Sequence, residues 1–500
     1  MVLLSTSGKN KYLSKGENDM NDPILLWNLV ALEANRVSHT NGLNEQTGPT
    51  RSARALAIVH LAMYDAYAGT DIPAALPRYL ALPPAPPAGA SIDAAVAAAA
   101  HKALSELFPG QRSFFDLMLA AADDPSDPGT SFGVAVAEAI LADRAGDPSG
   151  DSPGYVPSSA RGKHRPDPDN PGQGFHGAFY GANAKGFAVT ERFELAAPPF
   201  ANDEYRNALR EVRGKGIAPE LMGTLPAGVA ARTVDETLIG VFWAYDGVAQ
   251  LGSPPRLYNQ IIRLVATARA NSAAANARLF AFVNVAMADA AMLAWDQKYI
   301  HDLWRPVLGI REHDTSMGPA TTACENDIVE GCDTGWLPLG GPQTNRLGKN
   351  FTPPFPAYPS GHATFGAAAF HITRLFYNEG GRLSDGTLSR DNLFDGLCFV
   401  SDELNGISTD NKGTVRPRHL RDFPGGLAQM IEENGRSRVY LGVHWVFDAF
   451  AVTADGTADI TRQDGDKYIG GVPLGLQIAE DIFLAGGGIA PVLSTVGPRP

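Results

Sequence analysis

Apolar residues recur at three- and four-residue spacing along most of the chain, and strict alternation of apolar and polar residues is scarce. The segments Ile24–Thr40 and Thr50–Gly69 show the spacing clearly, and it is the period of an amphipathic α-helix. Further helices are expected at 91–108, 111–123, 131–145, 203–213, 233–248, 255–270, 272–303, 360–378, 425–434, 436–452 and near 474–484. We therefore predict an all-α fold, with at most a short hairpin in a loop.

Long segments rich in proline and glycine separate these helices, notably 72–90, 147–200 and 312–358. Loops of this length inside a compact protein are usually functional or wrap the surface. Composition does not shift sharply anywhere. We predict one integrated unit with three parts: a flexible N-terminal arm at 1–22, an N-terminal helical half at 23–270 and a C-terminal helical half at 271–500.

Composition excludes several classes of protein. The 500 residues are 44% hydrophobic and carry a net charge of −13 without a block of Lys and Arg, so no nucleic-acid or membrane-surface partner is expected. The apolar stretch at the N-terminus is four residues long and other apolar runs are short, so we expect neither a signal peptide nor a transmembrane segment. We therefore expect the protein to be cytoplasmic or to be exported by an unconventional route. We also expect it to form a homo-oligomer.

Cysteine usage excludes a disulfide framework, because the chain has only three cysteines, Cys324, Cys332 and Cys398. Three free thiols are the simplest interpretation, although a Cys324–Cys332 loop bridge and an intermolecular bond stay open. No Cys/His cluster has the spacing of a zinc site.

The first stretch with candidate chemistry is DQKYIHDLWRPVLGIR, residues Asp296–Arg311. Lys298 and Arg305 are seven residues apart, which places both on nearly one face of a helix that Pro306 ends or bends. Beside two tryptophans, Trp295 and Trp304, this stripe is either an anion site or an ordinary solvated face.

The second stretch is FPAYPSGHATFGAAAF, where a proline-rich loop becomes an Ala-rich helix. Ser360 stands at the expected N-cap, with Gly361 and His362 in the first turn. The first N–H groups of a helix lack internal partners and bind oxyanions, and a histidine there can move protons. The competing interpretation is a capped helix with a surface histidine.

The third stretch is GRSRVYLGVHWVFDAF, residues Gly435–Phe450. Arg438 precedes His444, and Asp448 follows His444 by four residues, on the same face of a helix. A carboxylate beside an imidazole fixes its tautomer and raises its basicity. A surface His–Asp pair is the alternative, but the apolar neighbours favour a half-buried site.

Together the three stretches supply three fixed cations, a helix N-terminus, a serine hydroxyl and two histidines, which suit a tetrahedral oxyanion with about two negative charges. The order Lys-x6-Arg-Pro, Pro-Ser-Gly-His and Ser-Arg-x5-His-x3-Asp resembles the signature shared by the type 2 phosphatidic acid phosphatases, the bacterial acid phosphatases and the vanadium-dependent haloperoxidases. The matching residues are Lys298, Arg305, Pro306, Pro359, Ser360, Gly361, His362, Ser437, Arg438, His444 and Asp448.

The chain is more similar to the haloperoxidases, because LLWNLVALEANRVSHT, GPTRSARALAIVHLAMYDAYAG and FWAYDG resemble the N-terminal half of that family. The likeness runs from about residue 24 to about residue 450. It implies two four-helix bundles, a fold that agrees with the helices expected above. It also implies vanadate as cofactor, with hydrogen peroxide, halide and small organic acceptors as reaction partners.

Carried over by position, the resemblance implies that His444 alone bonds to the metal. The other residues that would bind the vanadate oxygens are Lys298, Arg305, Ser360, Gly361 and Arg438. His362 would manage protons, Asp246 would pair with Arg438, and Asp448 would support His444. Lys298 would also polarise the peroxide that vanadium(V) activates as a Lewis acid, so that halide attack releases hypohalous acid, which halogenates organic compounds.

The resemblance also bears on the halide. Phe355 stands at a position where the family's chlorinating members carry phenylalanine and its algal brominating members histidine, so we expect turnover of bromide and also chloride. Trp295 would lie with Phe355 in the halide pocket. Two other functions stay open: a soluble acid phosphatase with a phosphohistidine at His444, and a non-catalytic scaffold that binds an anion.

Overall fold

The computed structural model describes residues 22–70, 75–122, 125–200, 202–312 and 332–500. The predicted N-terminal arm therefore lies outside the described residues, apart from Asp22. The Cys324–Cys332 bridge stays a prediction, because Cys324 also lies outside them.

Within the described residues the protein is built from helices, which confirms the predicted all-α class. The α-helices are α2 (Pro23–Ser38), α3 (Pro49–Thr70), α4 (Ile92–Leu107), α5 (Arg112–Ala122), α6 (Pro128–Asp143), α7 (Tyr180–Asn183), α8 (Asp203–Lys215), α9 (Val234–Phe242), α10 (Pro254–Ala268), α11 (Ala273–His301), α12 (Pro306–Arg311), α13 (Gly361–Phe376), α14 (Gly426–Tyr440) and α15 (Gly471–Ala485). Short 3₁₀ turns are η2 (Pro109–Gln111), η3 (Pro219–Thr224), η4 (Asp402–Leu404) and η5 (Val446–Asp448). The strands form two small antiparallel hairpins, one from β1 (Ala451–Val452) and β2 (Ala458–Asp459), the other from β3 (Gln463–Asp464) and β4 (Lys467–Tyr468).

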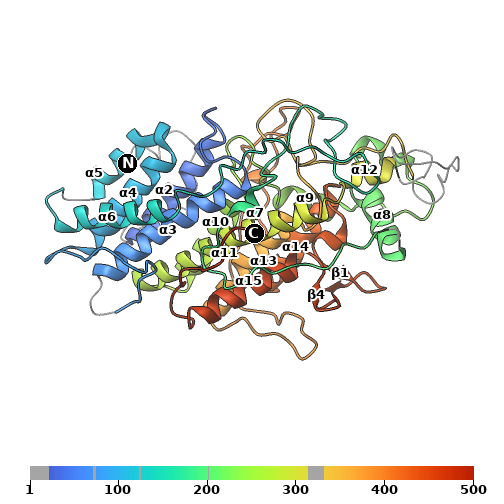
Figure 1. Ribbon diagram of the computed structural model, residues 1–500. Helices are drawn as coiled ribbons and strands as arrows, with labels where there is room; N and C mark the ends of the chain where they lie inside the picture. Colours follow the sequence, from blue (N-terminus) through green and yellow to red (C-terminus); the bar gives the residue numbers. More distant parts are fainter. Residues whose placement is uncertain (1–21, 71–74, 123–124, 201, 313–331) are drawn as a thin grey trace.

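Two groups of helices pack around α11 (Figure 1). In the N-terminal group, α3, α4 and α6 pack against one another, and α2 packs on α3 and α4. In the C-terminal group, α13 packs against α14 and α15. Since α11 contacts both α3 and α13, the 29-residue helix joins the two groups. The division into two four-helix bundles and the boundary at residue 270 stay predictions.

The helix α11 also bears on the expectation of no membrane span. It is the one helix in the described part of the chain that is long and apolar enough, by length and composition, to cross a bilayer. In its most apolar stretch, however, 94% of the residues are buried inside the protein, as in the central helix of a globular fold. The sequence analysis expected only short apolar runs. In α11 the isolated polar residues are buried together with the apolar ones, so the apolar segment is longer than any uninterrupted run.

A network of neutral polar side chains joins the two halves inside the core. The Asn28 side chain on α2 contacts His60 Nε2 on α3 at 2.8 Å and donates to Asn259 Oδ1 on α10 at 3.2 Å. Asn259 in turn donates to Asn284 Oδ1 on α11 at 2.9 Å. All four side chains are neutral and buried, and their hydrogen bonds fix the register of four helices. A charged group also touches the network, since Arg263 donates to Asn28 Oδ1 at 3.0 Å.

Candidate functional site

Lys298 and Arg305 do not share a helix face, contrary to the prediction from their spacing. The helix α11 ends at His301, and Asp302 adopts the left-handed conformation with φ 53° and donates its N–H to Lys298 O at 2.8 Å. Arg305 is extended, as expected for a residue before proline, and precedes α12. The chain turn at Asp302, rather than helical periodicity, brings the two cations to one site.

Lys298 is fully buried and its ammonium is bound by the loop before α13. Nζ donates to the carbonyl oxygens of Pro356 at 2.8 Å, Ala357 at 3.1 Å and Pro359 at 2.5 Å. An ammonium has three N–H groups, so these bonds use all of them. Burial and the nearby Arg305 hold the pKa of Lys298 well below its usual range.

The second motif forms the N-terminus of α13, which packs against α11, α14 and α15. Ser360 is the N-cap: its Oγ accepts the Ala363 N–H at 3.4 Å, and its own N–H donates to Asp448 O at 2.8 Å. At Gly361 an added Cβ would lie 3.2 Å from the Trp295 ring. A larger residue there would have to displace the indole by a few tenths of an ångström, so glycine allows its close approach.

The third motif departs from the predicted helix at 436–452. The helix α14 ends at Tyr440 in a Schellman motif, in which Gly442 (φ 73°) donates to Val439 O and Val443 donates to Arg438 O. His444 and Asp448 therefore lie in the following turn and η5, not on one helical face. The Gly in VYLGVH is the sequence signal for this ending, and it was overlooked.

The His444–Asp448 pair nevertheless forms. His444 Nδ1 lies 2.7 Å from Asp448 Oδ2, which also accepts the Trp445 N–H at 3.0 Å. With a proton on Nδ1, the lone pair of His444 Nε2 faces Arg305, whose Nη1 is 2.8 Å away. Burial raises the pKa of Asp448 to about 7, and burial with Arg305 nearby holds the pKa of His444 well below its usual range.

The segment after α9 brings two further groups to the site. Asp246 accepts from Arg438 at 2.7 and 3.2 Å and has Oδ1 3.8 Å from His362 Nε2. Ala244 O lies 2.6 Å from the same nitrogen, so His362 Nε2 carries the proton in this contact. Burial, with Arg438 nearby, lowers the pKa of His362 well below its usual range.

The turn η4 clamps this segment, a feature that the sequence analysis missed. Ser401 Oγ donates to Phe242 O at 2.7 Å, and the buried Glu403 accepts the Tyr245 N–H at 3.3 Å. Glu403 is itself held by Thr344 at 2.5 Å and by Arg416 at 2.8 Å. Tyr245 is in the left-handed region with φ 43°, so the clamp maintains a backbone conformation that most residues avoid.

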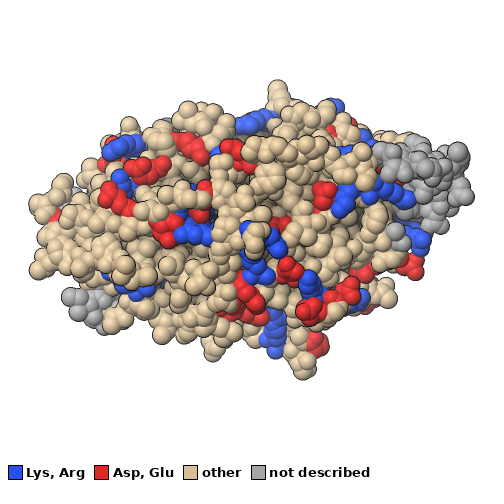
Figure 2. All heavy atoms as spheres, viewed as in Figure 1, with Lys and Arg blue, Asp and Glu red and all other residues tan. Residues whose placement is uncertain are grey.

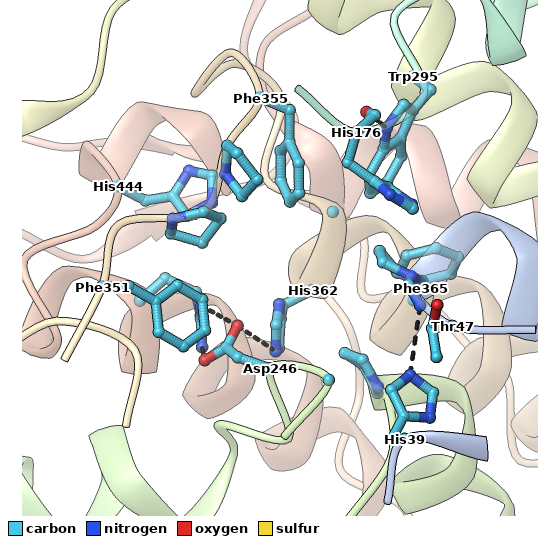
Figure 3. A pocket seen from close by; sticks show the side chains of 18 of the residues that line it. His39, Thr47, His176, Asp246, Trp295, Phe351, Phe355, His362, Phe365 and His444 are labelled. Atoms are coloured by element: carbon cyan, nitrogen blue, oxygen red, sulfur yellow. Dashed lines mark hydrogen bonds and ion pairs between the residues drawn. The ribbon is translucent and has the colours of Figure 1, made fainter. Parts of the chain in front are cut away.

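A cavity of about 220 Å³ opens at this point (Figure 3). The predicted site residues that line it are Asp246, Trp295, Phe355, Gly361, His362, Arg438 and His444. Lys298, Arg305, Ser360 and Asp448 lie behind this wall. Lining residues that the sequence analysis missed include His39, Thr47, His176, Arg346, Phe351 and Phe365. Phe365 lies on α13 and His39 caps the end of α2, whereas Thr47, His176, Arg346 and Phe351 come from loops, where periodicity gives no signal.

Phe355 links the cavity wall to the cations. Its ring lies 4.9 Å from that of Trp295, centroid to centroid. Lys298 Nζ and the Arg305 guanidinium carbon lie 5.1 and 5.0 Å from its centroid. The ring therefore contacts both buried cations through its face.

Charge and hydrogen bonding at the site are incomplete. The cations Lys298, Arg305 and Arg438 outnumber the carboxylates Asp246 and Asp448, and all five are buried or nearly so. Burial lowers the pKa of Arg305 to about 9. Among the described residues, Arg305 Nη2 and Arg438 Nε are buried without a hydrogen-bond partner. Unpaired cationic donors are costly to bury, so an oxyanion fits this donor set.

The fold and the site thus define an all-α protein with a buried, positively charged pocket suited to an oxyanion. A family model for the vanadium chloroperoxidase N-terminal domain matches residues 15–175, and one for the VCPO second helical-bundle domain matches residues 278–459. The vanadium chloroperoxidase of Curvularia inaequalis is 35% identical over 586 aligned positions, which cover 95% of this chain and 92% of the relative. The chain therefore belongs to the vanadium chloroperoxidase family.

Solved structures support the fold independently. A bacterial vanadium-dependent iodoperoxidase superposes with a TM-score of 0.61 at 18% identity, covering 93% of this chain and 96% of its own. A holo-type bacterial vanadium-dependent chloroperoxidase superposes with a TM-score of 0.59 at 15% identity, covering 88% and 92%. At these identities the likeness extends to the fold alone.

Proposed function

We propose that the protein is a vanadium-dependent haloperoxidase that oxidises halide with hydrogen peroxide to hypohalous acid. Membership of the family supports vanadate as the cofactor, and peroxide and halide as substrates. The observation that carries the proposal is the pairing of His444 Nε2 with Arg305 beside two buried, unpaired guanidinium donors. A metal oxyanion needs this combination of a neutral imidazole ligand and fixed positive charge.

His444 Nε2 is the proposed ligand of the metal. Arg305, Arg438, the Ser360 hydroxyl and the Gly361 N–H would hydrogen-bond the oxygens. When bound, vanadate would supply vanadium(V) as a Lewis acid that activates peroxide, and the oxidation state of the vanadium would not change.

The protein's own groups set the protons and exclude water. Asp448 holds the proton of His444 on Nδ1 and so keeps Nε2 available. The reaction consumes one proton as halide and peroxide become hypohalous acid and water. His362 is neutral and is held through Nε2 by Ala244 O, so its Nδ1 is the proposed atom that accepts and returns this proton.

Lys298 differs from the two arginines because its ammonium is bound entirely to the protein backbone. Its three N–H groups are bound to backbone carbonyls, so it positions the loop that carries Phe355 and Ser360. A hydrogen bond from Lys298 to a peroxide oxygen, as the resemblance implies, requires that one carbonyl be released.

Bromide is the proposed halide, together with chloride. Bromide is easier to oxidise, and Phe355 with Trp295 offers an apolar wall beside the cations. Small organic compounds are the proposed acceptors, in a homo-oligomer without a nucleic-acid or membrane partner. On the face that Figure 2 shows, Lys and Arg are interspersed with Asp and Glu.

The test is to add orthovanadate to the protein with peroxide, bromide and a brominatable phenol dye. Vanadate should activate halide-dependent peroxide consumption. If vanadate is bound and no bromination occurs, the proposal fails. Inhibition by vanadate of hydrolysis of a phosphomonoester, without bromination, would establish the phosphatase alternative instead.

A further inference from the structure

The cavity has two ends of different character (Figure 3). The inner end carries His444, His362 and Arg438, which the proposed function assigns to the anion. The outer end is formed by loops from other parts of the chain and carries His39, Thr47, His176 and Arg346. The proposed function gives none of these four residues a task.

The cavity is large enough for a small aromatic molecule. It measures about 220 Å³. An engineered apolar cavity of about 150 Å³ in another protein holds a benzene molecule. The space therefore accommodates one six-membered ring.

The walls between the two ends favour such a ring. Four aromatic side chains line the space, Trp295, Phe351, Phe355 and Phe365, together with the prolines Pro353 and Pro354. The His176 and Phe355 rings lie 6.3 Å apart, and His176 lies at the same distance from Trp295 in an edge-to-face arrangement. Aromatic rings at these separations contact a third ring favourably through edges and faces.

Hydrogen bonding at the outer end leaves one histidine available. His39 uses both ring nitrogens, with Nδ1 2.8 Å from Asn35 O and Nε2 accepting the Gly48 N–H at 3.2 Å. His176 uses Nε2, 3.2 Å from Thr50 Oγ1, and no partner of its Nδ1 is found among the described residues. Gly48 permits this position, because an added Cβ would lie 2.1 Å from His176 Cε1.

The charges at the outer end indicate which polar group a ligand there would carry. Arg346 is exposed, and its guanidinium donates to His39 O at 3.1 Å. The one carboxylate that lines the cavity, Asp246, is at the inner end and is paired with Arg438. A weakly acidic hydroxyl or its anion is therefore the complementary group.

We propose that the outer end binds the organic acceptor, a single-ring phenol or phenolate, with its oxygen toward His176 and Arg346 and its ring against Trp295 and Phe355. The inference rests on the proposed function for the supply of hypohalous acid. In the transfer, a ring carbon forms the carbon–halogen bond and loses its proton, and the halogen–oxygen bond breaks with its electron pair on oxygen. The oxygen and the ring proton leave as water.

Binding is tested first without chemistry. Phenol is titrated into the vanadate-free protein, and binding is followed by saturation-transfer NMR. We expect saturable one-to-one binding to the wild type and at least tenfold weaker binding to Thr47→Phe, which fills the outer end. The control Thr224→Phe makes the same change at an exposed position on η3 that does not line the cavity, and it should bind as the wild type does.

Absence of saturable binding to the wild type overturns the proposal, as does equal binding by Thr47→Phe. Should Thr47→Phe fail to fold, Arg346→Ala replaces it, because its side chain is exposed. Arg346→Ala should weaken phenolate binding severalfold at a pH above the phenol pKa, and an unchanged affinity contradicts the proposed orientation.

Product distribution is the second test, on the vanadate-loaded enzyme. Bromination of bound phenol should give an ortho-to-para ratio that differs at least twofold from that of reagent hypobromite. A ratio equal to that of the reagent shows that a diffusible oxidant acts in solution and overturns the proposal. Failure of the proposed function looks different, because no halide-dependent peroxide consumption then occurs.

Discussion

The protein contains two buried polar clusters that differ in charge and in completeness. The core network of Asn28, His60, Asn259 and Asn284 is neutral, and its amides and imidazole contact one another. The site around His444 is charged, and two of its guanidinium nitrogens have no partner within the described chain. Each cluster includes a buried histidine of lowered pKa, so burial of a histidine alone does not distinguish them.

The difference in charge and in hydrogen bonding distinguishes a ligand site from a structural cluster. A cluster that serves only the fold is satisfied internally, because each unpaired buried group reduces stability. A cluster that serves a ligand keeps donors and charge for it. Substitutions in the two clusters should therefore separate stability from vanadate affinity.

The sharpest separation is expected between two histidine variants. His444→Ala removes the proposed ligand, so vanadate affinity should fall by more than the roughly 10–100-fold that follows loss of a supporting partner, and halide-dependent peroxide consumption should reach background. His60→Ala is the matched control: it should lower stability and leave vanadate affinity close to that of the wild type. Vanadate titrations and urea unfolding of both proteins measure this, and full activity in His444→Ala would refute the assignment.

Arg438 should affect both properties, because it is fully buried and paired with Asp246. Arg438→Ala leaves that carboxylate uncompensated, which typically costs about 3–5 kcal/mol of stability, and also weakens vanadate binding. The double variant Arg438→Ala/Asp246→Asn should regain part of the stability and none of the affinity. Recovery of vanadate affinity in the double variant would contradict a direct role of Arg438.

Asn259 offers the opposite test in the core network. Asn259→Ala leaves the amide groups of Asn28 and Asn284 short of a partner and should reduce the free energy of unfolding by about 1–3 kcal/mol. Vanadate affinity should change less than about twofold, since no charge is altered. A large loss of affinity would show that the two clusters are coupled.

An effect of similar size, but one that depends on pH, is expected at Glu403, in the clamp on Tyr245. Burial raises the pKa of Glu403 from 4.5 to about 7, so the folded protein retains this proton while the unfolded chain loses it. The contribution of Glu403 to stability therefore falls as pH rises from about 4.5 to about 7. In Glu403→Gln this fall should be absent, a difference on the order of 2 kcal/mol between pH 5 and pH 7.5. Urea unfolding of both vanadate-free proteins at the two pH values measures it, and parallel pH profiles would disprove the link.

Helical periodicity was enough to predict the class of the fold, because packing makes a helix amphipathic wherever it lies on a core. The same rule misplaced two pairs of site residues. It treated Lys298 with Arg305, and His444 with Asp448, as neighbours on helices, whereas left-handed residues at Asp302 and Gly442 end α11 and α14 earlier. Only the glycine was recognisable as an ending.

The three sequence motifs identified the charged residues of the inner end, because the residue types and their order in these motifs are specific. The outer end could not be found in this way. His39, His176 and Arg346 lie far apart in the chain, the first at the end of α2 and the other two in loops, and each residue type is common on protein surfaces. Their meeting depends on tertiary packing, such as that of His176 on Gly48.

The helix α11 carries members of both clusters, Asn284 near its middle and Lys298 in its last turn. These residues are fourteen positions apart, about 21 Å at roughly 1.5 Å per residue, and no glycine or proline interrupts the helix. The two halves of the molecule are thus joined by a stiff rod that offers no hinge. Turnover should consequently proceed without domain closure, limited by chemistry or by diffusion through the cavity mouth rather than by a gate.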